Sequence, residues 1–176
     1  MPNDFWVFGY GSILWKVDFP FAERSTAHIK GWSRRFYQGS VDHRGIPGSP
    51  GRVVTLIDSP KEICWGIAYR LSNDGIEDTL AALDYRERGG YDRLEIDLHL
   101  ETGESVNGIT YFASGDNPNY LGHAETSDIA QQIFGASGPS GDNTEYVFRL
   151  EQTLGEIGSP DDHVTDIANQ LRQLKN

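Results

Sequence analysis

Cysteine is almost absent from this chain of 176 residues, because Cys64 is the only one. A disulfide within the chain is therefore impossible, and the apolar neighbours Ile63 and Trp65 favour a buried, reduced thiol. No basic neighbour that would activate this thiol is evident, so the sequence gives little support to a catalytic cysteine.

A metal-binding pattern is missing as well. One cysteine cannot build a zinc site, and the histidines show neither H-x-x-H nor HExxH spacing. These scattered histidines are His28, His43, His99, His123 and His163. We expect no metal and no other cofactor, and we interpret His43, in a glycine-rich stretch, as a hydrogen-bonded loop residue rather than a ligand contact.

Basic residues are scarce and long apolar runs are absent. Lys+Arg number 15 against 26 for Asp+Glu, and the net charge of -11 repels nucleic acid and anionic membranes. No apolar stretch approaches membrane-spanning length, and the first apolar run follows Asp4 without the positive region of a signal peptide. We expect a cytoplasmic monomer or homodimer with no nucleic-acid or membrane partner.

The chain length and a hydrophobic content of 38% suit one core, so we expect a single domain over residues 1–176. Strand patterns fill the first two thirds. They cover residues 5–8 and 26–37, a hairpin of 52–57 with 63–71 around Asp58-Ser59-Pro60, and an antiparallel pair of 94–100 with 106–111 around a turn at 101–104. Residues 42–51, rich in glycine and proline, read as a loop.

Helices are expected mainly in the last third. Asn73 or Asp74 can cap a helix that carries Ile76, Leu80 and Leu83 and ends before Gly89-Gly90. Three more helices are expected at 127–134, 143–153 and 161–174. Because crossover helices between the strands are missing, the pattern predicts an α+β fold with a mainly antiparallel sheet or small barrel.

The most informative segment is the turn that follows the first strand, from Gly9 to Leu14. Glycines on both sides of Tyr10 let a ligand approach the backbone, so the turn is either a tight bend or a cradle of N–H groups for an anion. Leu14 stands where a dinucleotide fingerprint needs glycine, and Ser12 lacks the flanking glycines of a hydrolase nucleophile.

A second suggestive segment runs from Leu83 to Tyr91, at the end of the first expected helix. There the helix dipole disfavours negative charge, which suits a carboxylate that exchanges protons, whereas Arg86 and Arg88 oppose that effect. Solvated salt bridges at the helix end are the plainer interpretation of the same residues.

Together these segments resemble the ChaC-type γ-glutamylcyclotransferases, and the match follows nearly the whole chain in order. The matching stretches are 7–16, 33–36, 39–40, 42–45, 50–56, 65–71, 83–91, 117–122, and 129 through 141 to 143–146. One departure is Ile13-Leu14, where the family usually has leucine and then isoleucine. Both orders are apolar and similar in volume.

The resemblance implies an enzyme that cleaves glutathione into 5-oxoproline and cysteinylglycine on a small β-barrel with flanking helices. It implies substrate binding by Gly9, Tyr10, Gly11, Ser12, Ile13 and Leu14, with Glu87 as the general acid and base. Arginines 34, 35, 44 and 52 are candidates for offsetting the anionic substrate, although ion pairs of the sheet surface explain each of them equally well.

Two alternatives stay open at this point. One is a cyclotransferase for other γ-glutamyl amino acids or γ-glutamylamines, which has the same residues but another leaving group. The other is a catalytically silent binding module of the same fold, against which the retention of both the glycine turn and Glu87 argues.

Overall fold

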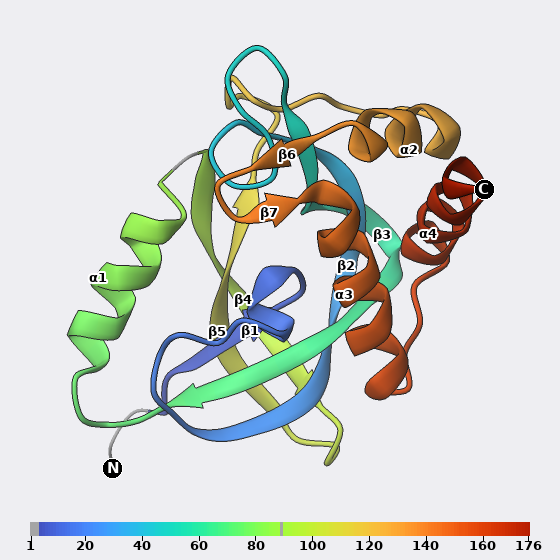
Figure 1. Cartoon of the computed structure of the whole chain (residues 1–176). Coiled ribbons are helices and arrows are strands. Elements are labelled where there is room, and N and C mark those ends of the chain that lie inside the picture. Colours follow the sequence, from blue (N-terminus) through green and yellow to red (C-terminus); the bar gives the residue numbers. More distant parts are fainter. Residues whose placement is uncertain (1–3, 89) are drawn as a thin grey trace. The chain divides into compact units, whose positions relative to one another are not determined.

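The computed structural model describes residues 4–88 and 90–176, and the chain divides into two compact units (Figure 1). The first unit comprises Met1–Ser33 and Asp58–Ser114. The second comprises Arg34–Ile57 and Gly115–Asn176. Among the described residues, no helix has the length and apolar character needed to cross a membrane.

Five strands form a closed barrel in the order β1-β3-β2-β4-β5. Their bounds are β1 (Trp6–Gly9), β2 (Phe21–Ser40), β3 (Gly51–Leu71), β4 (Tyr91–Leu100) and β5 (Ser105–Ala113). The long strands β2 and β3 each contribute to both units, with residues 21–33 and 58–71 in the first. The five strands and the helices confirm the predicted α+β barrel.

Three of the strand pairs in the first unit are antiparallel, and one is parallel. β1 pairs antiparallel with β3, and β4 pairs antiparallel with both β2 and β5. The parallel pair joins β1 to β5, with Trp6 opposite Gly108. A Cβ on Gly108 would lie 2.9 Å from the carbonyl oxygen of Trp6, so the close approach of these strands requires glycine.

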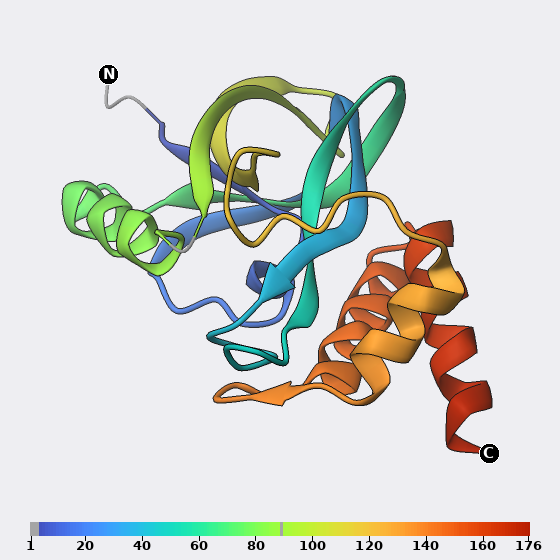
Figure 2. The ribbon, with the colours of Figure 1, turned by 90° about the horizontal axis from the view of Figure 1, so that it is seen from above.

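The predicted antiparallel pair with one wet face is confirmed in β4 and β5. Leu98 and Leu100 are buried, whereas Glu95 and Asp97, which alternate with them along the strand, are exposed. This alternation follows from the two-residue period of a strand, which sends successive side chains to opposite faces of the sheet. Figure 2 looks down on these curved strands, with α1 (Ile76–Arg86) beside them.

The predicted hairpin around Asp58-Ser59-Pro60 is wrong, because β3 continues through these residues without a turn. The fixed φ of proline is compatible with an extended chain, and Pro60 is exposed, where a missing N–H is tolerated. The Oγ atom of Ser59 lies 2.7 Å from that of Ser33 on β2, the strand next to β3 in the barrel. Pairing along β2 thus outweighs the local turn preference.

The predicted cap of α1 is also wrong. Gly75, rather than Asn73 or Asp74, is the N-cap residue, and its φ of 77° lies in the left-handed region that glycine adopts readily. The carbonyl of Gly75 accepts the N–H of Thr79 at 3.0 Å. The backbone therefore starts this helix, with no capping hydrogen bond from a side chain.

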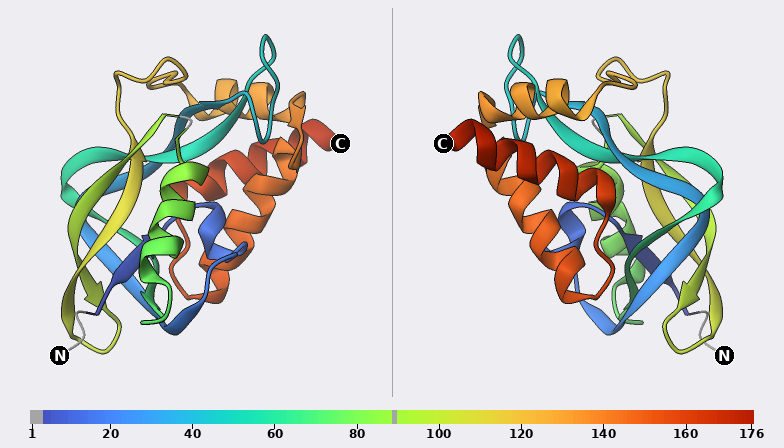
Figure 3. Two further views of the ribbon diagram at one scale, coloured as in Figure 1. Left: turned by 90° about the vertical axis from the view of Figure 1, so that its left-hand side faces the viewer. Right: turned by 90° about the vertical axis from the view of Figure 1, so that its right-hand side faces the viewer.

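The second unit contains three helices and a short ribbon, and the expected helices are confirmed. The elements are α2 (Thr126–Phe134), β6 (Ser137–Gly138), β7 (Gly141–Asp142), α3 (Asn143–Glu156) and α4 (Asp162–Lys175). α4 packs against both α2 and α3 (Figure 3). Buried residues such as Ile133, Leu150 and Ile167 form the core of this helical group.

His163 near the start of α4 ties that helix to the strand portion of the second unit. Its Nε2 atom accepts the backbone N–H of Phe36 at 3.0 Å, which requires a ring that is not doubly protonated. Burial, followed by the charge of Arg35, lowers the pKa of His163 to about 4. The fold therefore depends on a neutral imidazole at this position.

Acid should accordingly weaken the folded chain through His163. The unfolded histidine takes up its proton near its ordinary pKa of 6.5, but the folded one resists until about 4. Stability should therefore fall as the pH drops from about 6.5 to 4, by roughly 2–3 kcal/mol from this group. Urea unfolding of the wild type and of His163→Gln across this pH range measures the loss of stability. The variant should lose much of the pH dependence.

The matched control is His43→Gln, which changes an exposed loop histidine. It should keep the pH dependence of the wild type. An equal pH dependence in His163→Gln and the wild type would contradict the role of His163.

Candidate active site

The glycine turn predicted as a substrate loop follows β1 directly. Gly9 ends the strand, Tyr10 and Gly11 continue the chain, and a single 3₁₀ turn, η1 (Ser12–Leu14), follows. A Cβ on Gly9 would lie 2.9 Å from Cγ2 of Ile13, too close for any real side chain. Glycine at position 9 therefore lets the turn fold back on itself.

Hydrogen bonds fix the backbone of this turn. The N–H of Leu14 donates to the carbonyl of Gly11 at 2.9 Å, and the hydroxyl of Tyr69 donates to that of Ile13 at 2.9 Å. Burial raises the pKa of Tyr69 to about 12, which keeps this donor protonated. Among residues 4–88 and 90–176, no acceptor bonds the N–H groups of Gly11, Ser12 and Ile13, as expected at a helix start.

Side chains of the turn point mostly into the protein. Tyr10, Ile13 and Leu14 are buried, and the hydroxyl of Tyr10 donates to the carbonyl of Tyr111 at 2.5 Å. Ser12 is half-buried. The turn therefore offers a ligand its backbone N–H groups and the Ser12 hydroxyl rather than its large side chains.

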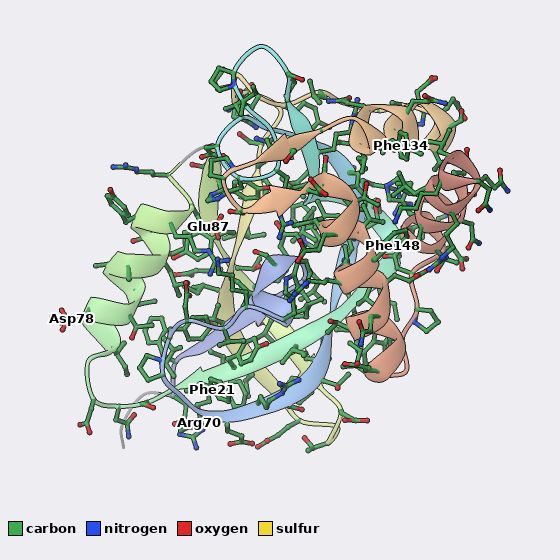
Figure 4. All side chains as sticks on the ribbon, viewed as in Figure 1. Phe21, Arg70, Asp78, Glu87, Phe134 and Phe148 are labelled. Atoms are coloured by element: carbon green, nitrogen blue, oxygen red, sulfur yellow. The ribbon has the colours of Figure 1, made fainter. Side chains whose placement is uncertain are left out.

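Glu87, the predicted acid and base, occupies the residue that ends α1. Its N–H donates to the carbonyl of Leu83 at 3.0 Å, and its own carbonyl accepts from Tyr91 at 3.1 Å. Figure 4 shows Glu87 between α1 and the strands, and its side chain is 18% exposed. The sequence correctly placed this carboxylate at the C-terminal end of a helix.

Arg86 brings the two predicted motifs together. One terminal nitrogen of its guanidinium donates to Oγ of Ser12 at 2.9 Å, and its Nε lies 3.8 Å from Oε1 of Glu87. The other terminal nitrogen donates to Asp18 at 3.0 Å. Sequence reasoning noted Arg86 only as a helix-end charge, because nothing local links it to Ser12.

The neighbouring carboxylate, Asp84, has a structural task. It accepts the hydroxyl of Tyr111 at 2.6 Å and is paired with Arg93, at 2.5 Å. The hydrogen bond from Tyr111, with help from Arg93, holds the pKa of Asp84 below its usual value. Burial and the bond to Asp84 raise the pKa of Tyr111, so its hydroxyl stays a donor. These contacts tie the end of α1 to β4 and β5.

Three of the arginines considered as anion-binding candidates are engaged within the second unit. Arg34 is 1% exposed and pairs with Asp161 at 2.8 Å. Arg44 donates to the carbonyl of Asp142 at 2.9 Å, and Arg52 donates to that of Phe36 at 2.8 Å. These side chains therefore have structural contacts, but they are buried rather than in ion pairs of the sheet surface.

The first unit thus brings together the carboxylate of Glu87, the guanidinium of Arg86 and the glycine turn, whose N–H groups at positions 11–13 bond no acceptor among the described residues. Such a combination can bind the carboxylate of an amino acid while its ammonium lies beside a group that accepts a proton. Acid–base chemistry on an amino acid requires this arrangement. The barrel and this site together indicate an enzyme.

Comparison with known proteins identifies the family. The family model described as ChaC-like protein matches residues 5–174, and this chain belongs to that family. It is 48% identical to Gamma-glutamylcyclotransferase 2-3 of Arabidopsis thaliana, with 96% of this chain and 89% of that protein covered. It is 37% identical to Glutathione-specific gamma-glutamylcyclotransferase 1 of Rattus norvegicus, covering 98% and 81%.

A solved structure agrees with these relatives. The crystal structure of the yeast γ-glutamyl cyclotransferase specific to glutathione matches with a TM-score of 0.90 and 27% identity, covering 97% of this chain and 96% of that one. The fold expected from the resemblance is therefore confirmed along nearly the whole chain.

Removal of the Tyr111 hydroxyl tests how firmly the end of α1 is held. Tyr111→Phe should lower the free energy of unfolding by about 1–2 kcal/mol, because a partly buried, charge-assisted hydrogen bond is lost. Urea denaturation measures this change in the free energy of unfolding. Tyr85→Phe, on the exposed face of α1, is the control and should change stability by less than about 0.5 kcal/mol; equal effects of the two changes would contradict the anchoring role.

Proposed function

We propose that this chain is a glutathione-specific γ-glutamylcyclotransferase that releases 5-oxoproline and cysteinylglycine. The observation that carries the proposal is the Arg86 guanidinium, which joins the glycine turn to the carboxylate of Glu87. The names of the relatives from Arabidopsis thaliana and Rattus norvegicus support it.

The reaction closes a ring within the substrate itself. The α-amine of the γ-glutamyl group attacks its own γ-carbonyl carbon, a C–N bond forms, and the bond to the cysteinyl nitrogen breaks. Since nucleophile and electrophile belong to one molecule, an enzyme that holds the glutamyl chain folded removes much of the entropic barrier.

Glu87 handles the protons of this reaction. At neutral pH the α-amine is an ammonium without a lone pair, so Glu87 first removes a proton as general base. The cysteinyl nitrogen leaves poorly as an anion, so the protonated Glu87 then delivers that proton to it. The attacking nitrogen loses a second proton as it becomes the lactam N–H, and Glu87 passes this proton too to the released amine. Cysteinylglycine thus leaves as an ammonium, and the carboxylate of Glu87 is regenerated.

The backbone N–H groups of the glycine turn donate hydrogen bonds to negatively charged groups of the substrate. The N–H groups of Gly11, Ser12 and Ile13 hold the α-carboxylate or the oxyanion that develops on the γ-carbonyl. Gly9 makes room for the fold of the turn, while Tyr10 and Leu14 anchor it in the core. Ser12 positions the substrate and does not act as a nucleophile.

The direct test is incubation of the purified protein with glutathione, followed by detection of 5-oxoproline and cysteinylglycine. γ-Glutamyl-alanine and γ-glutamyl-lysine, assayed in parallel, distinguish glutathione from other γ-glutamyl substrates. No 5-oxoproline from any of the three would overturn the proposal. A cytoplasmic location stays a prediction that cell fractionation tests. A monomeric or homodimeric state stays a prediction that light scattering tests.

Glu87→Gln should abolish turnover while glutathione still binds. The amide keeps the shape of the side chain but accepts no proton, and loss of general acid–base catalysis costs about 10²- to 10⁴-fold in rate. Product release measures turnover, and calorimetry measures affinity. Glu77→Gln, at the exposed start of the same helix, should stay fully active; near-normal product release by Glu87→Gln would sink the assignment.

Gly11→Val should weaken substrate binding more than it slows the chemical step. A branched side chain at this position crowds the backbone donors beside it, so we expect a raised KM. Gly155→Val, whose added side chain meets open space in α3, is the control for a glycine-to-valine change. A KM for Gly11→Val equal to that of Gly155→Val would contradict the cradle.

A further inference from the structure

Arg86 has donor capacity left over after its contacts within the protein. A guanidinium carries five N–H groups in a rigid fork. One terminal nitrogen uses a hydrogen on Ser12 and the other uses one on Asp18, which leaves one N–H on each. The side chain is 21% exposed, so the guanidinium is held in place but can still be reached by a ligand.

The arrangement of charges at this place is that of an amino-acid receptor. Nε of Arg86 lies 3.8 Å from Oε1 of Glu87, so a positive and a negative group stand side by side. The head of a γ-glutamyl group likewise carries an ammonium and a carboxylate on one carbon atom. Opposite charges face each other when the ammonium meets Glu87 and the carboxylate meets Arg86.

We propose that Arg86 binds the glutamyl α-carboxylate of glutathione and thereby turns the α-amine toward Glu87. The proposal rests on the function given above and extends it by one binding residue. The hydrogen-bond donors of the site then bind different groups of the substrate. The guanidinium of Arg86 binds the α-carboxylate on the side of Ser12. The N–H groups of the glycine turn then remain available to the oxyanion of the γ-carbonyl.

Other charged groups around this place do not cancel the pairing. Asp18 also contacts Arg86, but its side chain is 57% exposed, where water screens its charge. Asp84 on α1 is committed to Tyr111 of β5 and to Arg93 of β4. The charge of Arg93 is thus matched locally, whereas Arg86 contacts both Ser12 and Glu87.

A cycle of one protein change and one substrate change tests the contact. The substrate is compared with a glutathione analogue whose glutamyl α-carboxylate is a primary amide, which removes the charge and keeps the α-amine. The protein is compared with Arg86→Gln, and with Arg86→Met as a second variant. Circular dichroism and thermal unfolding establish that each variant is folded.

The wild type should prefer glutathione over the amide by roughly 10- to 100-fold in kcat/KM, the usual range for a hydrogen bond to a charged group. Arg86→Gln should lower kcat/KM for glutathione and shrink this preference to within about threefold. Any intrinsic difference in reactivity between the two substrates cancels, since it enters both protein forms equally.

Arg70→Met is the matched control. Arg70 is 26% exposed and pairs with Asp4 and Glu23, but it lies well away from Glu87 in the same unit (Figure 4). It should keep the full preference for glutathione. If the Arg86 variants keep that preference too, the contact is refuted while the function stands; if the wild type releases no 5-oxoproline, the function itself fails.

Discussion

Tyr111 is the residue on which the geometry of the site depends. Its hydroxyl donates to Asp84 near the end of α1, and its carbonyl accepts the hydroxyl of Tyr10 in the glycine turn. One residue of β5 therefore fixes both elements that carry the proposed site residues. Because a catalytic carboxylate must be held to within about half an ångström, such anchoring by buried hydrogen bonds matters as much as the reacting group.

Charge at the end of α1 is balanced locally, although the whole chain carries a net charge of -11. A helix C-terminus disfavours a carboxylate through the dipole of its backbone. Arg86 brings a positive group to 3.8 Å from Glu87. The sequence showed these opposing effects without deciding between them, and the contact shows that a cation stands beside the carboxylate.

Periodic patterns made most of the fold predictable, since burial and alternation are local consequences of which residues face the core. The wet face of β4 and the helices of the last third follow from such patterns. The hairpin predicted around Asp58-Ser59-Pro60 is wrong because turn preference is also local, whereas β3 is held by its long neighbour β2. Gly75 was missed because a backbone cap leaves no side-chain signal.

The site was predictable only in part, for a related reason. Glu87 and the glycine turn came from a resemblance along the whole chain, not from their spacing. The contacts of Arg86 with Ser12 and of Tyr111 with Asp84 join residues far apart in sequence, and many other pairings of arginine, tyrosine and carboxylate were equally compatible with the composition. Only the three-dimensional structure selects among them.

Burial of the turn bears on the order of its two apolar residues, isoleucine and then leucine. Ile13 is 8% exposed and Leu14 is 3% exposed, so both side chains fill the core rather than meet a ligand. The carbonyl of Ile13 is held by Tyr69 and the N–H of Leu14 by Gly11, contacts that involve only the backbone of the turn. An exchange of leucine and isoleucine therefore repacks the interior at similar volume and leaves the backbone donors in place. What the turn must preserve is the path of its main chain, and that path is set by Gly9 and by the tyrosines that hold it.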